Sequence, residues 1–143
     1  SLMIGGSKVG MDVVVACPKD YMPQERVVRW AQENAAAFGR TVTVTQDVKA
    51  AMEDADVVLT DVFASMGQEE ESAKRLRDFE GYQVNEELFS LAKPDAIFLH
   101  CLPAHRGEEV TSGVIDGPRS VIFDEAENRL HAQKAVMALL MKG

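Results

Sequence analysis

Residues 96–110 read AIFLHCLPAHRGEEV, and this stretch decides how the rest of the chain is interpreted. The apolar run at 96–99 is typical of a buried strand. Residues 100–106, which follow this run, include His100, Cys101, His105 and Arg106. In an open parallel α/β sheet, ligands bind at the carboxyl ends of the strands. The stretch therefore predicts a strand that ends in a chemical site.

Further short, apolar and β-branched runs lie on both sides of this stretch, and segments with helical signals separate them. Continuous apolar runs are typical of strands buried on both faces. Alternating strands and helices predict an α/β domain with a parallel sheet, of Rossmann-like three-layer type. We expect about five strands, at 13–16, 41–44, 57–60, 96–99 and 121–123, and helices near 24–38, 48–54, 69–79, 85–92 and 125–141.

Composition limits the function further. The chain has 143 residues, enough for one domain, and a net charge of -8 that argues against nucleic acid as the main partner. No apolar run approaches the roughly 20 residues of a membrane helix, and no signal-peptide pattern is present. Two cysteines, Cys17 and Cys101, without metal-type spacing favour a reducing cytoplasm over a disulfide scaffold.

Polar residues that could bind a ligand follow three of the predicted strands, those at 57–60, 96–99 and 121–123, and together they suggest one site. Each residue also has an ordinary interpretation: Cys101 as a small buried side chain, Asp61 as a turn cap, and Arg129 as a surface partner of Glu125. His100 is expected to pack or to bond to backbone. The residues that would line the site are Asp61, Ser65, Cys101, His105, Arg106 and Arg129.

The segment GGSKVG at 5–10 superficially matches a glycine-rich nucleotide loop. A dinucleotide fingerprint follows a strand and opens a helix, whereas these glycines precede the strand expected at 13–16. A helix C-cap and turn is the better interpretation. A nicotinamide-dependent dehydrogenase is therefore only a third alternative.

Three motifs resemble the ornithine carbamoyltransferase family. The resemblance covers essentially the whole chain but only the carboxyl-terminal half of that family's enzymes. One departure is Phe63, where the family usually has tryptophan. The motifs are DVFASMGQE at 61–69, FLHCLPAHRGEEVT at 98–111 and FDEAENRLHAQKAVM at 123–137, with further likeness at 10–23 and 115–121.

The resemblance implies a reaction without metal or organic cofactor. The δ-amine of ornithine attacks the carbonyl carbon of carbamoyl phosphate, and citrulline and phosphate result. By analogy, Cys101 and the Leu102 carbonyl lie near the reacting nitrogen, and Arg129 bonds to the carbamoyl oxygen, so that Cys101 and Arg129 are the catalytic residues. Asp61 and Ser65 would hold the ornithine α-amino group, with Met66 contributing backbone. His105 and Arg106 match the motif but receive no chemical step.

The family's carbamoyl-phosphate loop is not in this sequence, so residues 1–143 resemble an isolated ornithine-binding domain. The first, central strand of the family's sheet would lie upstream, which leaves 13–16 and 41–44 as one flank and the later strands as the other. The expected partners are the two substrates, an amino-terminal domain, and further copies in a trimer-based homo-oligomer. Two functions remain open: a transferase part that is inactive alone, and a non-catalytic amino-acid-binding domain.

Overall fold

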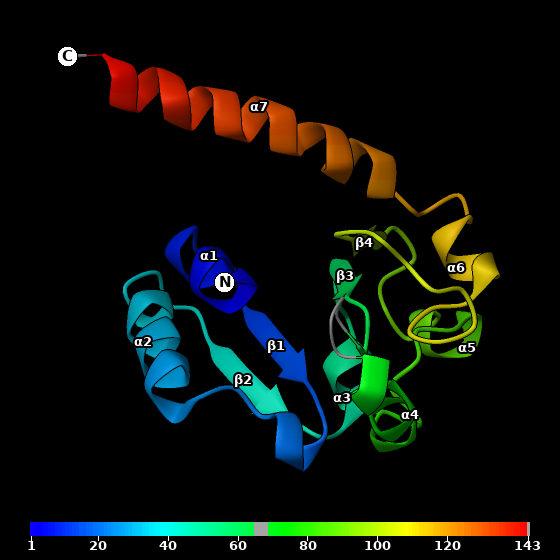
Figure 1. The fold of residues 1–143 in the computed structure, drawn as a ribbon. Coiled ribbons are helices and arrows are strands. Elements are labelled where there is room, and N and C mark those ends of the chain that lie inside the picture. The colour runs from blue at the N-terminus through cyan, green and yellow to red at the C-terminus, as the bar shows by residue number, and fades with distance from the viewer. Residues whose placement is uncertain (65–68, 143) are drawn as a thin grey trace. The chain divides into compact units, whose positions relative to one another are not determined.

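The structure is a computed structural model that describes residues 1–64 and 69–142 (Figure 1). The chain forms two compact units, residues 1–51 and 52–143. Each contains one pair of parallel strands.

The first unit is a βαβ arrangement preceded by a short helix. Its strands run parallel, with Val13 opposite Val42 and Ala16 opposite Thr45. The helix between them makes the crossover that a parallel pair requires. In chain order the elements are α1 (Leu2–Lys8), β1 (Val13–Ala16), the 3-10 turn η1 (Lys19–Tyr21), α2 (Glu25–Ala36), β2 (Val42–Thr45) and α3 (Val48–Met52), whose last residue begins the second unit.

The core of the first unit lies between its helices and one face of β1 and β2. Met3 of α1 and Ala31 and Ala35 of α2 are buried against Val42. Val13, Val15 and Val44 pack against the same cluster, whereas Val14 on the opposite face is exposed. Since successive strand residues point to opposite faces, one side of this pair is the buried side. The expected burial of both faces is wrong for these residues.

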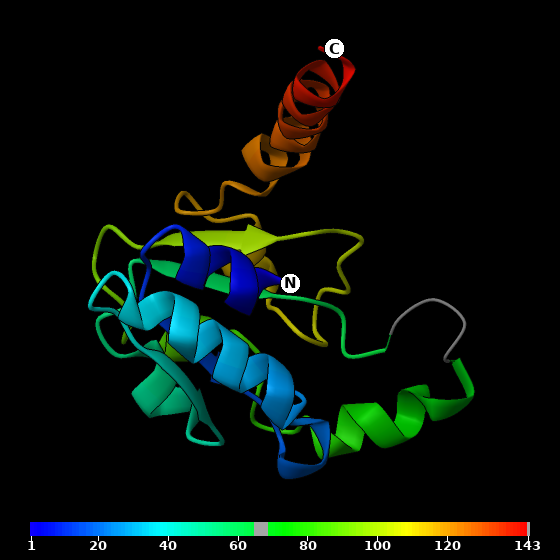
Figure 2. The same cartoon turned by 90° about the vertical axis from the view of Figure 1, so that its left-hand side faces the viewer.

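The second unit contains residues 96–110, with their strand and the loop that follows it. Its strands are also parallel, with Val57 opposite Ile97 and Thr60 opposite His100. Figure 2 shows β3 and β4 side by side and α7 leading away from them. The elements are β3 (Val57–Thr60), α4 (Glu69–Asp78), α5 (Glu86–Phe89), β4 (Ile97–His100), α6 (Ser112–Ile115) and α7 (Ile122–Met141).

Phe98 is the centre of the second unit's core. It is fully buried, and its ring meets that of Phe89 edge-on at 6.1 Å between centroids. The guanidinium of Arg119 lies 3.8 Å from the centre of the Phe89 ring. The backbone of Phe98 also bonds to residues on both sides of Ser120. One residue of β4 thus joins α5, β4 and the segment before α7.

The predicted strands at 13–16 and 57–60 are confirmed, and those at 41–44 and 96–99 each lie one residue later. The predicted strand at 121–123 is wrong, because α7 already begins at Ile122. Only an isolated parallel bridge forms there, between Phe98 and Ser120. Asp124 and Glu125 lie in the first turn of α7, where acidic side chains favour a helix start. The described residues therefore contain four strands.

Local signals placed the helix starts better than their ends. The expected cap at Asp47 is confirmed, since its carboxylate accepts a 3.0 Å bond from the N–H of Ala50. Asn85 caps α5 in the same way, through the N–H of Leu88. The segment 5–10 differs in part from the expectation, because its first two glycines lie inside α1. Gly10 supplies the predicted turn with a φ of 77°.

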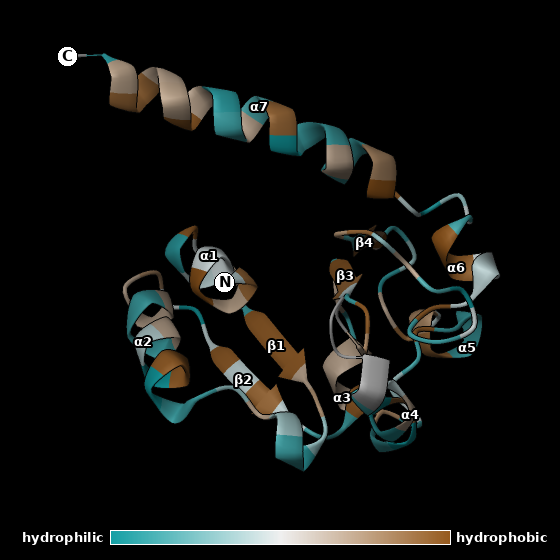
Figure 3. Ribbon diagram, in the orientation of Figure 1, coloured by the Kyte–Doolittle hydropathy of each residue, from teal (hydrophilic) through white to brown (hydrophobic). Residues whose placement is uncertain are grey.

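The last helix, α7, carries hydrophobic residues along its length (Figure 3). Most of its apolar side chains are exposed. Only Ile122 at its start is buried. Among the described residues, no helix combines the length and hydrophobicity that crossing a membrane requires. The exposed apolar residues of α7 are Phe123, Leu130, Val136, Met137, Leu139, Leu140 and Met141.

The position of Phe98 leads to a test of the second unit's core. Phe98→Ala should lower the free energy of unfolding by about 3–5 kcal/mol, since it removes a fully buried ring and leaves a cavity. Phe123→Ala is the matched control, because that ring is 76% exposed, and it should change stability by no more than about 0.5 kcal/mol. Urea unfolding followed by circular dichroism measures both. Equal effects would contradict the placement of Phe98.

Candidate functional site

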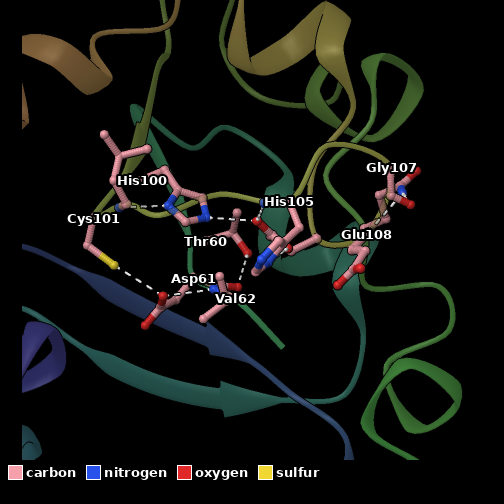
Figure 4. Close-up of polar contacts among 11 residues, drawn as sticks. Thr60, Asp61, Val62, His100, Cys101, His105, Gly107 and Glu108 are labelled. Carbon is pink, nitrogen blue, oxygen red and sulfur yellow. Dashed lines mark hydrogen bonds and ion pairs between the residues drawn. The ribbon is translucent and has the colours of Figure 1, made fainter. Parts of the chain in front are cut away.

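The register of β3 and β4 brings Asp61 and Cys101 together. Thr60 and His100 are opposite each other at the strand ends, so the next residue of each strand emerges at the same edge. Figure 4 shows the Cys101 thiol directed at the Asp61 carboxylate. Two residues 40 positions apart in sequence thus meet where ligands bind in parallel sheets.

The Cys101 thiol is a neutral hydrogen-bond donor. Its Sγ lies 3.1 Å from Asp61 Oδ1. Partial removal of the thiol from water, the hydrogen bond to Asp61 and the negative charge of that carboxylate raise the pKa of Cys101 to about 11. A thiolate nucleophile needs the opposite surroundings. Cys101 is therefore suited to orient a substrate rather than to attack it.

The Asp61 carboxylate keeps acceptor capacity for a ligand. Oδ1 accepts a 2.8 Å bond from the N–H of Val62 as well as the thiol hydrogen. Within the described residues, Oδ2 has no hydrogen-bond partner, and the residue is exposed. An exposed carboxylate oxygen beside a thiol is a suitable acceptor for an ammonium group.

The residue after Cys101 has an unusual backbone. Leu102 has a φ of 55°, in the left-handed region that costs a residue with a side chain about 1–2 kcal/mol. The Leu102–Pro103 peptide bond is cis. The N–H of Leu102 donates to His100 Nδ1 at 2.9 Å. That bond makes Nδ1 an acceptor, so the ring hydrogen of neutral His100 is on Nε2.

A buried carboxylate completes this arrangement. His100 and Glu109 are both fully buried, and His100 Nε2 lies 3.1 Å from Glu109 Oε1. The same oxygen accepts a 2.6 Å bond from the N–H of His105. Glu109 thus fixes both the imidazole that supports Leu102 and the backbone beyond Pro103. The loop that carries Cys101 depends on these bonds.

The far side of the loop is tied to the segment before α5. The amide of Gln83 donates to the carbonyls of Gly107 and Glu108, each at 2.8 Å. Val84 exchanges backbone bonds with Glu109 and Thr111 around the parallel bridge to Val110. A φ of 90° at Gly107 permits the turn between them. The loop is therefore held at both ends.

The polar partners of His105 and Arg106 are residues other than Asp61 and Cys101. Arg106 forms a two-pronged ion pair with Asp116, at 2.8 and 2.7 Å. This pairing raises the pKa of Arg106 and lowers that of Asp116. The Nδ1 atom of His105 lies 3.9 Å from Glu109 Oε2. Both residues belong to the loop, and neither is bonded to Asp61 or Cys101.

The structure assembles only part of the predicted site. Arg129 lies on α7, is exposed, and has no polar partner among residues 1–64 and 69–142. The alternative pairing of Arg129 with Glu125 is thus absent there. Ser65 and Met66 lie outside the described residues. Phe63, at the position where the resembling family usually has tryptophan, is buried and stacks on Phe79 with 4.7 Å between ring centroids.

Glu109 is the residue that sequence reasoning missed. The sequence contains two adjacent glutamates, 108 and 109, and nothing in their identity distinguishes the buried one. The prediction that His100 packs or bonds to backbone is confirmed, but its second bond, to Glu109, was not expected. The one signal in the sequence was that a carboxylate, Glu109, follows within ten residues of the histidine at the strand end, His100.

The role of Glu109 can be tested through stability. Glu109→Ala leaves the buried His100 Nε2–H and the His105 N–H without acceptors. Each unsatisfied donor costs about 1–3 kcal/mol of stability. We expect the free energy of unfolding to fall by more than about 2 kcal/mol in buffer with EDTA. Glu108→Ala is the matched control and should change it by no more than about 0.5 kcal/mol. A smaller effect at 109 than at 108 would refute the assignment.

The raised pKa of Cys101 predicts an alkylation profile. Only the thiolate reacts, so the iodoacetamide rate at Cys101 should still be rising at pH 10, although the residue is exposed. Asp61→Ala should move the profile to lower pH, because it removes the hydrogen bond and the negative charge that favour the neutral thiol. Asp56→Ala, at an exposed carboxylate paired with Lys93, should not. Mass spectrometry separates Cys101 from Cys17, and a plateau near pH 9 in the unaltered protein would contradict the prediction.

Comparison with known proteins places this geometry in a family. Residues 1–140 match the family model described as aspartate/ornithine carbamoyltransferase, Asp/Orn binding domain. Ornithine carbamoyltransferase of Pyrococcus abyssi is 59% identical over 143 residues, which is 100% of this chain and 45% of that protein. The enzyme of Carboxydothermus hydrogenoformans is 61% identical over 99% of this chain and 45% of its own length.

Solved structures agree with the sequence comparison. Ornithine carbamoyltransferase from Pyrococcus furiosus superimposes with a TM-score of 0.94 at 59% identity, over 100% of this chain and 46% of that one. An N-acetyl-L-ornithine transcarbamylase mutant gives 0.85 at 36% identity, over 99% and 43%. The chain spans a little under half the length of these relatives. With residues 1–140 matched by the family model, the chain belongs to the Asp/Orn-binding domain family of the aspartate/ornithine carbamoyltransferases.

Proposed function

We propose that this chain is the ornithine-binding domain of an ornithine carbamoyltransferase. The observation that carries the proposal is the Asp61 carboxylate beside the neutral Cys101 thiol at the ends of β3 and β4. The identity of 59% to ornithine carbamoyltransferases over the full chain supports ornithine as the amino-acid substrate. We also propose that it acts in the cytoplasm, consistent with two free thiols, Cys17 and Cys101.

The proposed reaction transfers a carbamoyl group. The δ-nitrogen of ornithine attacks the carbonyl carbon of carbamoyl phosphate, forming a C–N bond as the bond to the phosphate oxygen breaks. The nitrogen loses one proton, which the leaving phosphate accepts, and the products are citrulline and phosphate. Because attack needs a neutral amine with a free electron pair, the site must hold the amine without protonating it. A thiol that stays neutral near pH 7 meets that requirement.

Asp61 and the residues after β4 have distinct proposed roles. The unpaired oxygen of Asp61 accepts hydrogen bonds from the ornithine α-ammonium group, with Ser65 and the backbone of Met66 assisting. The Cys101 sulfur and the Leu102 carbonyl orient the δ-amine toward the carbamoyl carbon. The left-handed backbone at Leu102 supports this role, since strained conformations are retained where they position functional groups.

Arg129 has the other proposed catalytic role. Its guanidinium would bond to the carbamoyl oxygen, where negative charge develops during attack. That the side chain is exposed and unpaired in the described part of the chain supports its availability to a ligand. The family resemblance at 123–137 is the basis for assigning it.

The proposed partners follow from the length of the relatives. The related ornithine carbamoyltransferases are about twice as long as this chain, so a second domain would bind carbamoyl phosphate. The family also implies a trimer-based homo-oligomer. The alternative function, a non-catalytic amino-acid-binding domain, shares the ornithine site but needs no second domain. Reconstitution separates the two functions.

Reconstitution is the decisive test. The 143-residue chain alone should form no measurable citrulline, because the family's carbamoyl-phosphate loop, which would bind the leaving phosphate, is not in this sequence. Mixed with a separately produced amino-terminal part of the Pyrococcus furiosus enzyme, it should form citrulline from ornithine and carbamoyl phosphate. Aspartate and N-acetylornithine should not replace ornithine. Sedimentation of the mixture would measure the oligomeric state.

Two variants make the test specific. Asp61→Ala should weaken ornithine binding to the chain at least about tenfold, as expected for a charged hydrogen bond. Asp56→Ala is the matched exposed carboxylate and should bind as the unaltered chain does. Ornithine binding by NMR titration without turnover in any mixture would favour the non-catalytic alternative. Unchanged affinity in Asp61→Ala, or robust turnover by the chain alone, would refute the proposal.

A further inference from the structure

The loop after β4 gathers three potential metal ligands outside the Asp61–Cys101 pair. They are one imidazole and two carboxylates, from His105, Glu108 and Glu109. One donor atom from each lies within 4.8 Å of the other two. Figure 4 shows His105 and Glu108 on this loop. Exposed acidic residues often gather without binding anything, so proximity alone does not make a site.

The second observation is an unpartnered oxygen on a buried carboxylate. Glu109 is fully buried, and its Oε1 accepts the bonds from His100 and His105 described above. Its Oε2 is buried and has no hydrogen-bond partner among the described residues. Leaving such an acceptor unsatisfied costs about 1–3 kcal/mol or more, so native structures rarely do it without a ligand or water.

The position of this oxygen suits a metal ion. It lies 3.9 Å from His105 Nδ1, which is too far for a hydrogen bond. Two ligands of a tetrahedral zinc ion, each bonded at about 2.1 Å, are about 3.4 Å apart. A shift of a few tenths of an ångström at His105 would therefore place both atoms in one coordination sphere. The His105 side chain is 51% exposed, so it can move and an ion can enter.

We propose that His105 Nδ1, Glu109 Oε2 and the Glu108 carboxylate bind a divalent transition-metal ion of the Zn²⁺ type. Two carboxylates neutralise the ion, and the imidazole selects it over Mg²⁺, which prefers an all-oxygen octahedral shell. A solvent molecule completes the fourth position. The site uses neither Asp61 nor Cys101, so it stands independently of the proposed ornithine site.

Metal binding would stiffen the loop that carries Cys101. The carboxylate of Glu109 would hold the ion through Oε2 while Oε1 keeps its bonds to His100 and His105. Such outer bonds orient a ligating carboxylate and strengthen the site. An ion that binds the folded chain also raises its melting temperature, since it shifts the unfolding equilibrium.

The test is a zinc titration of the chain carrying Cys101→Ser, because the thiol is a competing zinc ligand. Isothermal titration calorimetry at pH 7.5 should find one Zn²⁺ per chain, and Mg²⁺ should not displace it. In this background His105→Gln and Glu108→Gln should each weaken zinc binding more than about tenfold. His131→Gln is the matched control, since His131 and Glu127 form an ordinary exposed pair on α7, and it should bind zinc unchanged.

A second readout keeps the test independent of the calorimetry. Zn²⁺ should raise the melting temperature of the Cys101→Ser chain and of its His131→Gln derivative, but not of the His105→Gln or Glu108→Gln derivatives. Both substituted residues have side chains partly in solvent, and circular dichroism before titration verifies that each variant is folded. Absence of zinc binding in the Cys101→Ser chain, or equal loss in the His131→Gln control, would overturn the proposal.

Discussion

The buried carboxylate of Glu109 is the interaction on which the candidate site depends. Its Oε1 accepts from His100 Nε2 and from the N–H of His105, and so joins the end of β4 to the far side of the loop. The imidazole of His100, held by Glu109, in turn fixes the backbone of Leu102, because its Nδ1 accepts a hydrogen bond from the N–H of Leu102. These bonds offset the cost of the left-handed backbone at Leu102, and that backbone sets where Cys101 and the Leu102 carbonyl point.

The partner of Cys101 decides what its sulfur can do. A cysteine beside a cationic group loses its proton and becomes a nucleophile, whereas Cys101 donates to a carboxylate, and partial burial together with that carboxylate raises its pKa to about 11. Its contribution is therefore geometric. For two small polar substrates that react directly, orientation can supply much of the acceleration, because it replaces a chance encounter with a fixed approach.

The sequence predicted the strands well where local pattern and tertiary pairing agree. Residues 13–16 and 57–60 are β-branched runs whose backbone groups pair with a neighbouring strand over their full length. Residues 121–123 are likewise apolar, but the pairing with Phe98 occurs just before them, at Ser120. Once the chain has passed that bridge, the acidic residues that follow favour a helix. Composition alone could not locate the last paired residue.

By itself the sequence determined that Asp61 and Cys101 lie just after the predicted parallel strands at 57–60 and 96–99, because apolar runs and the polar residues after them are visible in the chain. It also supplied the motifs that identify the family. Only the tertiary structure decided that those two side chains meet, since the strand register sets which ends coincide. Likewise, Glu108 and Glu109 are chemically identical neighbours, and only packing buries one against His100 and leaves the other partly in solvent. Burial and bond partners are properties of the folded chain and not of any residue type.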